Sequence, residues 1–432
     1  MRRARLLRGF DETVDVRITL AACGTHDRRT AVFPRGRPRT GGIGIAPSST
    51  RACGGPALGW VHLVALGWLT MIALSVLVHV IPAFTDVVWR WETLARRSLT
   101  VYAVGVVVLV AGFCTGARGI LSWGGTIVAL GLLGYAVPAA VTLVSAFRLG
   151  RVEAAIARAL GATLTFLLLA AALGVAFTWA LDGRLPATIL VTGAPIHAEL
   201  GLIGWLTVLI MGVSARTVGP IAGARSAQAW RHVTAGSAEI VGMVAAGAGF
   251  AIRLPTVLWI GTVVLGIGVA VYVIDLSSIL RRATVSHRPP QAFMAWAALW
   301  LLLAFVLGVG TLRGSPWGPA FVYVVLMGWL GQMVNAHLHH IGIRLLSTAF
   351  RGDDDETRPG ELLSVTLSWT TFVLFQAAVL AGVAALLLDH WTLHTAAAAA
   401  GLLGWVAMTA NALYAARRAS QPTPVISLLG IR

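Results

Sequence analysis

Long apolar segments are the feature that most constrains this chain. Eleven of them approach or exceed the ~20 apolar residues that the hydrocarbon core of a bilayer requires. They lie near residues 58–82, 98–115, 120–147, 158–181, 196–219, 232–252, 255–280, 291–312, 318–345, 362–388 and 394–416. Alternating ten-residue patterns of the kind found in membrane barrels are absent. We therefore expect an all-α integral membrane protein with eleven transmembrane helices.

Three of these segments share a motif that indicates an internal repeat. Each contains a Gly-Trp pair, and a basic or imidazole side chain follows twelve residues after the glycine. The pairs are Gly67-Trp68, Gly204-Trp205 and Gly328-Trp329, and the following side chains are His79, Arg216 and His340. The spacing of 137 and then 124 residues leaves room for four helices per unit. Short motifs also recur by chance in a chain rich in Gly and Trp, but the spacing favours a pseudo-threefold repeat of four-helix units.

The distribution of arginine predicts the topology. All 33 basic residues are Arg, and the odd-numbered connections between helices hold three each, whereas the even-numbered ones hold one or none. The positive-inside rule then places the odd connections and the C-terminus in the cytoplasm of a plasma (bacterial inner) membrane. A net charge of +16 could also suggest a nucleic-acid partner. Because the arginines flank membrane helices, topology explains them better, and lipid is the expected partner.

The N-terminal segment does not fit this topology. Residues 1–57 carry eleven Arg and no apolar stretch long enough for a signal sequence. This segment is either a disordered basic arm or a non-native translated stretch that replaces a lost first helix. We therefore divide the chain into the arm at 1–57, a helical bundle at 58–418 and a cytoplasmic tail at 419–432. Cysteine shows no pairing or metal spacing and says nothing about redox compartment.

Histidine is the residue type in which a function could reside, and the topology sorts it into two layers. His62, His197, His390 and His394 belong to the outer layer, and His79, His337, His339 and His340 to the inner one. His62 and His79 are about 26 Å apart along one helix, so a site has to form within a layer. Imidazole inside a membrane normally faces the bundle interior, where it pairs, moves protons or binds metal. The alternative is that each histidine merely joins two helices by a hydrogen bond.

Other polar and aromatic side chains leave alternatives open. His337 and His340 share a helix face, and His79 is the repeat equivalent of His340, so these three form a fallback inner site. Glu239 is an intramembrane carboxylate and hence a functional candidate. Glu199 could fix the tautomer of a ligating histidine. The three repeated tryptophans either pack around the glycines, which we favour, or flank a flat macrocycle.

The repeat, with a histidine at the start of one repeat helix and a His-x-His on another, resembles subunit I of the haem-copper oxidases. That family has twelve helices in pseudo-threefold symmetry. His62 is similar to its haem ligand on the second helix, His197 to a copper ligand on the sixth, and His337-Leu338-His339 to a pair of haem ligands on the tenth. Ile81-Pro82 is similar to the proline that closes the second helix.

A second resemblance covers about 25 residues. His197 through Met211-Gly212-Val213-Ser214-Ala215-Arg216 is similar to a stretch of the NnrS-type haem- and copper-containing membrane proteins, which are connected with nitric oxide stress. The two resemblances imply haem b, a redox, electron-transfer or nitric-oxide-related role, and a protein or quinol electron donor. No adjacent His pair occurs in 232–252 or 255–280, so a complete copper centre is not expected.

The resemblance and the layers together give the candidate sites. The expected haem-binding residues are His62, His197, His337, His339 and His340, and the residues assigned to a metal are His79, His390 and His394. If the protein is an enzyme, it is an oxidoreductase without a complete haem-copper centre. The competing functions are a small-molecule or metal transporter and a ligand-free membrane scaffold. A transporter is disfavoured because the three repeat helices run in the same direction rather than in inverted halves.

Overall fold

The computed structural model describes residues 55–225, 228–352 and 357–421. Within them, eleven helical spans are long and apolar enough to cross a membrane, and there is no strand. The expectation of an all-α multi-pass membrane protein is confirmed. Three spans contain π-helical segments, labelled η. The elements are α1 (Gly55–His62), η3 (Leu63–Thr70), α2 (Met71–Thr85), α3 (Glu92–Thr115), α4 (Arg118–Arg148), α5 (Ala154–Leu181), α6 (Thr188–Glu199), η4 (Leu200–Thr207), α7 (Val208–Ala222), α8 (Ala229–Ala251), α9 (Pro255–Leu280), α10 (Pro289–Leu312), α11 (Gly318–Tyr323), η5 (Val324–Leu330), α12 (Gly331–His337), η6 (Leu338–Gly342), α13 (Ile343–Arg351), α14 (Pro359–Leu362), α15 (Val365–Leu388) and α16 (Trp391–Ala419).

Several helices extend beyond the apolar segments expected from the sequence. α3 begins at Glu92 rather than near residue 98, and the ninth span ends at Arg351 rather than near residue 345. The extra turns carry charged side chains, which reach the polar interface while their backbone stays helical. α1 begins at Gly55, before the expected boundary at residue 58. The expectations for residues 1–54 and 422–432 lie outside the described residues.

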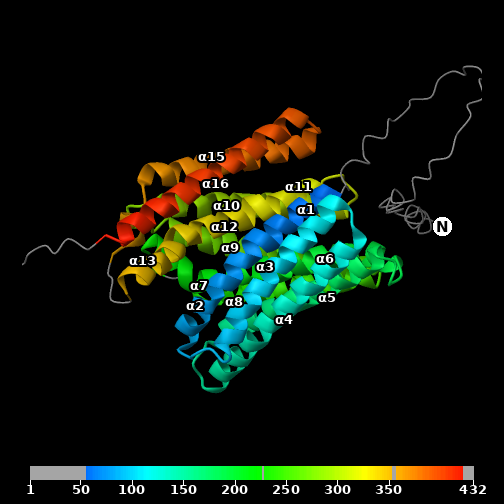
Figure 1. Ribbon diagram of the computed structural model, residues 1–432, viewed down its shortest axis with the longest axis horizontal. Helices are drawn as coiled ribbons and strands as arrows, with labels where there is room; N and C mark the ends of the chain where they lie inside the picture. Colours follow the sequence, from blue (N-terminus) through cyan, green and yellow to red (C-terminus); the bar gives the residue numbers. More distant parts are fainter. Residues whose placement is uncertain (1–54, 226–227, 353–356, 422–432) are drawn as a thin grey trace, which may run out of the picture.

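The units of the repeat share one packing order. In each unit a central span is followed by a helical hairpin, which is α3–α4 in the first unit, α8–α9 in the second and α15–α16 in the third. A bridging helix then leads to the next unit: α5 packs against η4 and α7, and α10 packs against η5 and α12. Within the described residues, no bridging helix precedes α1. Figure 1 shows the α15–α16 hairpin lying along one edge of the bundle.

Glycine seams hold two of the hairpins together. In α3, Gly105 and Gly112 are seven residues apart, and a Cβ on Gly112 would lie 2.7 Å from the Cα of Leu121 in α4. In α8, a Cβ on Gly242 would lie 2.6 Å from the backbone nitrogen of Leu265 in α9. Small residues at such spacing let two membrane helices approach until their backbones touch. The helices of these two hairpins are therefore closely packed against each other.

The three spans that carry the Gly-Trp motif run in the same direction and form the centre of the bundle. α1, α6 and α11 lie toward one end, and α2, α7 and α13 toward the other (Figure 1). We call these the outer and the inner end, following the arginine pattern. The segments η3, η4 and η5 all contain the motif and pack against one another. Three π segments at equivalent places support the internal repeat, since such segments are rare.

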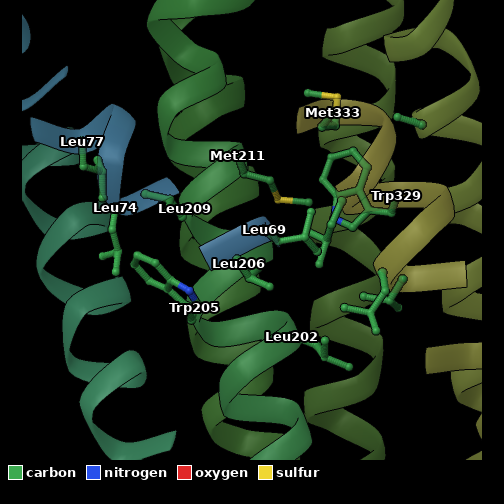
Figure 2. Packing of buried hydrophobic residues seen from close by; sticks show 14 of the residues in the cluster. Leu69, Leu74, Leu77, Leu202, Trp205, Leu206, Leu209, Met211, Trp329 and Met333 are labelled. Atoms are coloured by element: carbon green, nitrogen blue, oxygen red, sulfur yellow. The ribbon is translucent and has the colours of Figure 1, made fainter. Parts of the chain in front are cut away.

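The repeated tryptophans connect one unit to the next. The indole Nε1 of Trp205 donates to Thr70 Oγ1 at 2.9 Å, and that of Trp329 donates to Thr207 Oγ1 at 3.1 Å. Both rings are at most 2% exposed. Figure 2 shows Trp205 beside Leu74 of the first unit and Trp329 beside Met211 of the second. Trp205 and Trp329 thus pack between helices, as we favoured from the sequence.

The third side of this ring differs. Trp68 of the first unit faces the third unit, where Gly331 replaces the threonine found in the other two. A Cβ on Gly331 would lie 3.1 Å from Cη2 of Trp68. The buried Nε1 of Trp68 has no hydrogen-bond partner among the described residues. We refer to the three contacts as the first–second, second–third and third–first interfaces.

Candidate functional site

The outer ends of the three central spans meet in a staggered register. His62, Glu199 and Tyr323 lie five residues before the glycine of their motifs, and Trp60, His197 and Phe321 lie seven before it. At the first–second interface the rings of His62 and His197 are 6.3 Å apart. At the third–first interface Tyr323 stacks on Trp60 at 5.7 Å. At the second–third interface Glu199 and Phe321 line one cavity. Equivalent positions of the three interfaces therefore hold a histidine pair, a stacked tyrosine and tryptophan, and a cavity with a carboxylate.

The outer histidine pair is formed by rings at an interplanar angle of 24°. The Nδ1 of His62 lies 2.8 Å from the carbonyl of Leu58, one turn earlier, and the Nδ1 of His197 lies 3.0 Å from the carbonyl of Ala170 in α5. A carbonyl can only accept, so Nδ1 is the protonated nitrogen in both rings. Neither Nε2 atom forms a hydrogen bond within the part of the chain that the structure describes, and each keeps a free lone pair.

One phenylalanine ring contacts each member of this pair. His62 stacks on Phe113 of α3 at 4.7 Å, and the edge of Phe177 in α5 meets His197 at 5.4 Å. Gly174 makes room for His197, because a Cβ there would lie 3.1 Å from the ring. The rings lie between helices and are only partly exposed. The expectation that Glu199 fixes a histidine tautomer is wrong, since backbone carbonyls occupy both Nδ1 atoms and Glu199 points to α8.

The inner histidines do not assemble into one site. His337 lines a small cavity of about 80 Å³ between α2, α7 and α12. Its Nδ1 donates to the carbonyl of Met333 at 2.7 Å, and its Nε2 lies 2.9 Å from Thr217 Oγ1. His79 is exposed and does not line this cavity. The residues of α2 that line the cavity are apolar. The fallback site of His79, His337 and His340 is therefore not formed.

The remaining sequence candidates have separate surroundings. His339 is 4% exposed, donates from Nδ1 to the carbonyl of Asn335 at 2.8 Å and lies 5.5 Å from the ring of Phe293. His340 lies in η6 close to His287. His390 and His394 are exposed at the start of α16. No group of three or more metal-binding side chains exists among the described residues.

The structure also separates residues that the oxidase resemblance would bring together. His62 lies at the outer end of its span, whereas His337 and His339 lie toward the inner end of theirs. The level of the three repeated tryptophans lies between these two positions. One haem cannot reach both layers. His337 and His339 are therefore not partners of His62 in this chain.

One polar cluster was not foreseen from the sequence. Asp275 on α9 is 1% exposed and lies 3.4 Å from His232 and 3.8 Å from Arg231, both on α8. Spacing along the sequence does not bring Asp275 to these side chains, because the contact crosses from one helix to another. His232 and Glu239 are two turns apart on α8 and therefore lie on the same face of that helix. This spacing is the one sequence feature that relates His232 to a residue of the bundle interior.

One titratable group lies in a connection between spans. His287, between α9 and α10, has both ring nitrogens buried without a hydrogen-bond partner among the described residues. Burial, together with the neighbouring His340, lowers the pKa of His287. The neutral imidazole is therefore the form that the fold prefers.

Comparison with known proteins adds no assignment. No protein-family model matches the chain, and no curated protein is similar to it in sequence.

Proposed function

We propose that this multi-pass membrane protein binds haem b through His62 and His197 and takes part in electron transfer or a nitric-oxide-related redox reaction. The observation that carries the proposal is the meeting of two imidazoles from two repeat helices, each with its Nδ1 on a backbone carbonyl. Metal-binding histidines are typically held in this way, because the second nitrogen then keeps its orientation and its lone pair.

The two rings lie close together although they come from two different repeat helices. Their centres are 6.3 Å apart. This contact supports the proposal independently of the resemblance.

Haem fits this donor set better than a bare metal ion. Copper or zinc sites in proteins usually take three or four side-chain ligands. The described residues contain no such group, whereas haem iron needs only one or two from the protein. Two neutral imidazoles are therefore sufficient for haem and insufficient for an isolated ion.

The residues of this chain have distinct parts in the proposed activity. Haem, when bound, supplies one-electron chemistry. His62 and His197 hold the iron through neutral nitrogens, and the carbonyls of Leu58 and Ala170 keep the rings oriented. Phe113 and Phe177 limit access of water to the pair. The electron donor, a protein or a quinol, is part of the same proposal.

Absorption spectra of the purified protein test the proposal. The dithionite-reduced protein, expressed with adequate haem, should show the band of a b-type haem. His62→Ala and His197→Ala should each abolish or shift this band, because each removes one nitrogen ligand. His79→Ala is the matched control, since His79 lies on the same span and is exposed. A colourless wild-type protein would refute haem binding and favour a small-molecule carrier.

We also infer that the inner end and the C-terminus face the cytoplasm of a bacterial inner membrane. The three arginines in each odd connection support this orientation. A reporter fused after Arg432 should be active only on the cytoplasmic side. Activity of the same fusion on the outer side would reverse the orientation.

A further inference from the structure

The second–third interface contains a cavity of about 510 Å³. Its walls come from α6 and η4, α8, α9, α10, and the α11–η5 segment. Glu239 and Phe250 both line it and are eleven residues apart on α8, so the cavity extends about 16 Å along that helix. At its other end it reaches Leu312, the last residue of α10, and Gly318, the first of α11. It therefore runs from the middle of the bundle to the outer end.

Two carboxylates are the only charged side chains in this wall. Glu199 comes from α6 and Glu239 from α8. Glu239 is 2% exposed, and its buried Oε1 has no hydrogen-bond partner among the described residues. Each carboxylate lies over a glycine of a neighbouring helix: a Cβ on Gly247 would lie 2.7 Å from Glu199 Oε2, and one on Gly268 would lie 3.0 Å from Glu239 Oε1. The packing thus leaves room for both carboxylates, and no described side chain forms an ion pair with either.

The rest of the wall is apolar and rich in aromatic rings. Phe250, Phe305, Phe321 and Trp329 come from four different elements. A volume between 300 and 1,000 Å³ is typical of a site for an organic molecule. The faces of aromatic rings attract cations, and aromatic cages bind quaternary ammonium groups. An acidic, aromatic and otherwise apolar cavity therefore suits a ligand that is both lipophilic and positively charged.

We propose that this cavity is a binding site for a lipophilic organic cation, such as a quaternary ammonium or phosphonium compound, held by Glu199 and Glu239. An uncompensated carboxylate in a membrane interior is costly, and a cationic ligand supplies the counter-charge that the described cavity wall lacks. A lipid acyl chain would fill the volume but would leave the carboxylates unpaired. The site is separate from the His62–His197 pair and does not depend on haem.

Binding of tetraphenylphosphonium to the full-length protein in nanodiscs tests this proposal, with empty nanodiscs as the background. Tetraphenylborate is the matched probe, because it has nearly the same size and shape and the opposite charge. Saturable binding of the cation and none of the anion is expected. A charge-assisted contact is worth about 1.5–3 kcal/mol, so Glu239→Gln and Glu199→Gln should each weaken binding by roughly 10- to 100-fold.

Two further variants distinguish loss of the carboxylate charge at the site from a general disturbance of the fold. Glu239→Asp keeps the charge and should retain most of the affinity that Glu239→Gln loses. Glu92→Gln removes a surface carboxylate that pairs with Arg96 and should bind as the wild type does. Size-exclusion profiles show whether each variant is folded. Equal binding of both probes, equal binding to the wild type and the folded double Gln variant, or no binding of the cation would each overturn the proposal.

Discussion

The first–second and second–third interfaces are built on the same helix register, yet one holds a pair of imidazoles and the other a cavity with two carboxylates. Below both, a tryptophan donates to a threonine of the preceding unit. Near the outer end, His62 meets His197 in one case, and Glu199 and Phe321 line a cavity in the other. At these two interfaces the repeat therefore supplies a scaffold that is constant at the level of the tryptophans. The chemistry lies in the positions above it, which differ from unit to unit.

The largest effect is expected from removing a tryptophan of this ring. Trp205→Ala should lower the free energy of unfolding by about 3–5 kcal/mol, because it deletes a large ring that is 2% exposed and leaves a cavity. The measurement is reversible unfolding in mixed micelles. The exposed Trp91 is the control, and Trp91→Ala should change stability little. A loss below about 1 kcal/mol for Trp205→Ala would mean that the ring does not hold the units together.

The third–first interface gives the next largest effect, since it lacks the threonine. Gly331→Ala should cost about 1–3 kcal/mol by overpacking. Its Cβ would lie 3.0 Å from the carbonyl oxygen of Leu326 and 3.1 Å from Trp68, so backbone and ring would both have to move. Gly161→Ala is the control, since nothing lies within 4 Å of a Cβ at Gly161. If Gly331→Ala is as stable as Gly161→Ala, the close contact with Trp68 is not needed.

Removal of single hydrogen bonds should distinguish the first–second and second–third interfaces, which have a Trp–Thr hydrogen bond, from the third–first interface, which has none among the described residues. Thr70→Val and Thr207→Val each leave a buried indole N–H without its acceptor and should cost about 0.5–2 kcal/mol. Trp68→Phe removes an indole N–H that has no described partner, and its cost should be confined to lost packing. Trp205→Phe, by contrast, should cost more than Trp68→Phe. The reverse order would place an unseen acceptor at Trp68.

The sequence was sufficient for the spans and the repeat, because apolar length and motif spacing are properties of a single helix. It was not sufficient for contacts between helices. The register places Glu199 at the position of His62, but the staggered packing brings His62 to His197 instead. The inner site failed for the same reason: His79 follows the twelve-residue spacing but is exposed, while Thr217 lies at the Nε2 of His337.

The cavity also could not be predicted from the sequence. Glu239 was identified as an intramembrane carboxylate, but the apolar wall around it comes from five separate stretches of chain. The glycines that leave room for the carboxylates, Gly247 and Gly268, are indistinguishable in the sequence from those that close the helical hairpins. Only the packing decides which glycine brings two backbones together and which one accommodates a side chain.

The smallest expected effect is a dependence of stability on pH that His287, in the connection between α9 and α10, contributes. Burial lowers the pKa of His287 below its ordinary value of about 6.5, so the folded protein favours the neutral ring. As pH falls below about 6.5, the unfolded state binds the proton first, and the stability present at higher pH is progressively lost. The thermal midpoint should therefore decline from pH 7 toward pH 5, and less steeply in His287→Gln than in the wild type. Identical slopes for His287→Gln and the wild type would mean that the connection between α9 and α10 does not respond to protonation, and the pH dependence would then belong to the histidines within the spans.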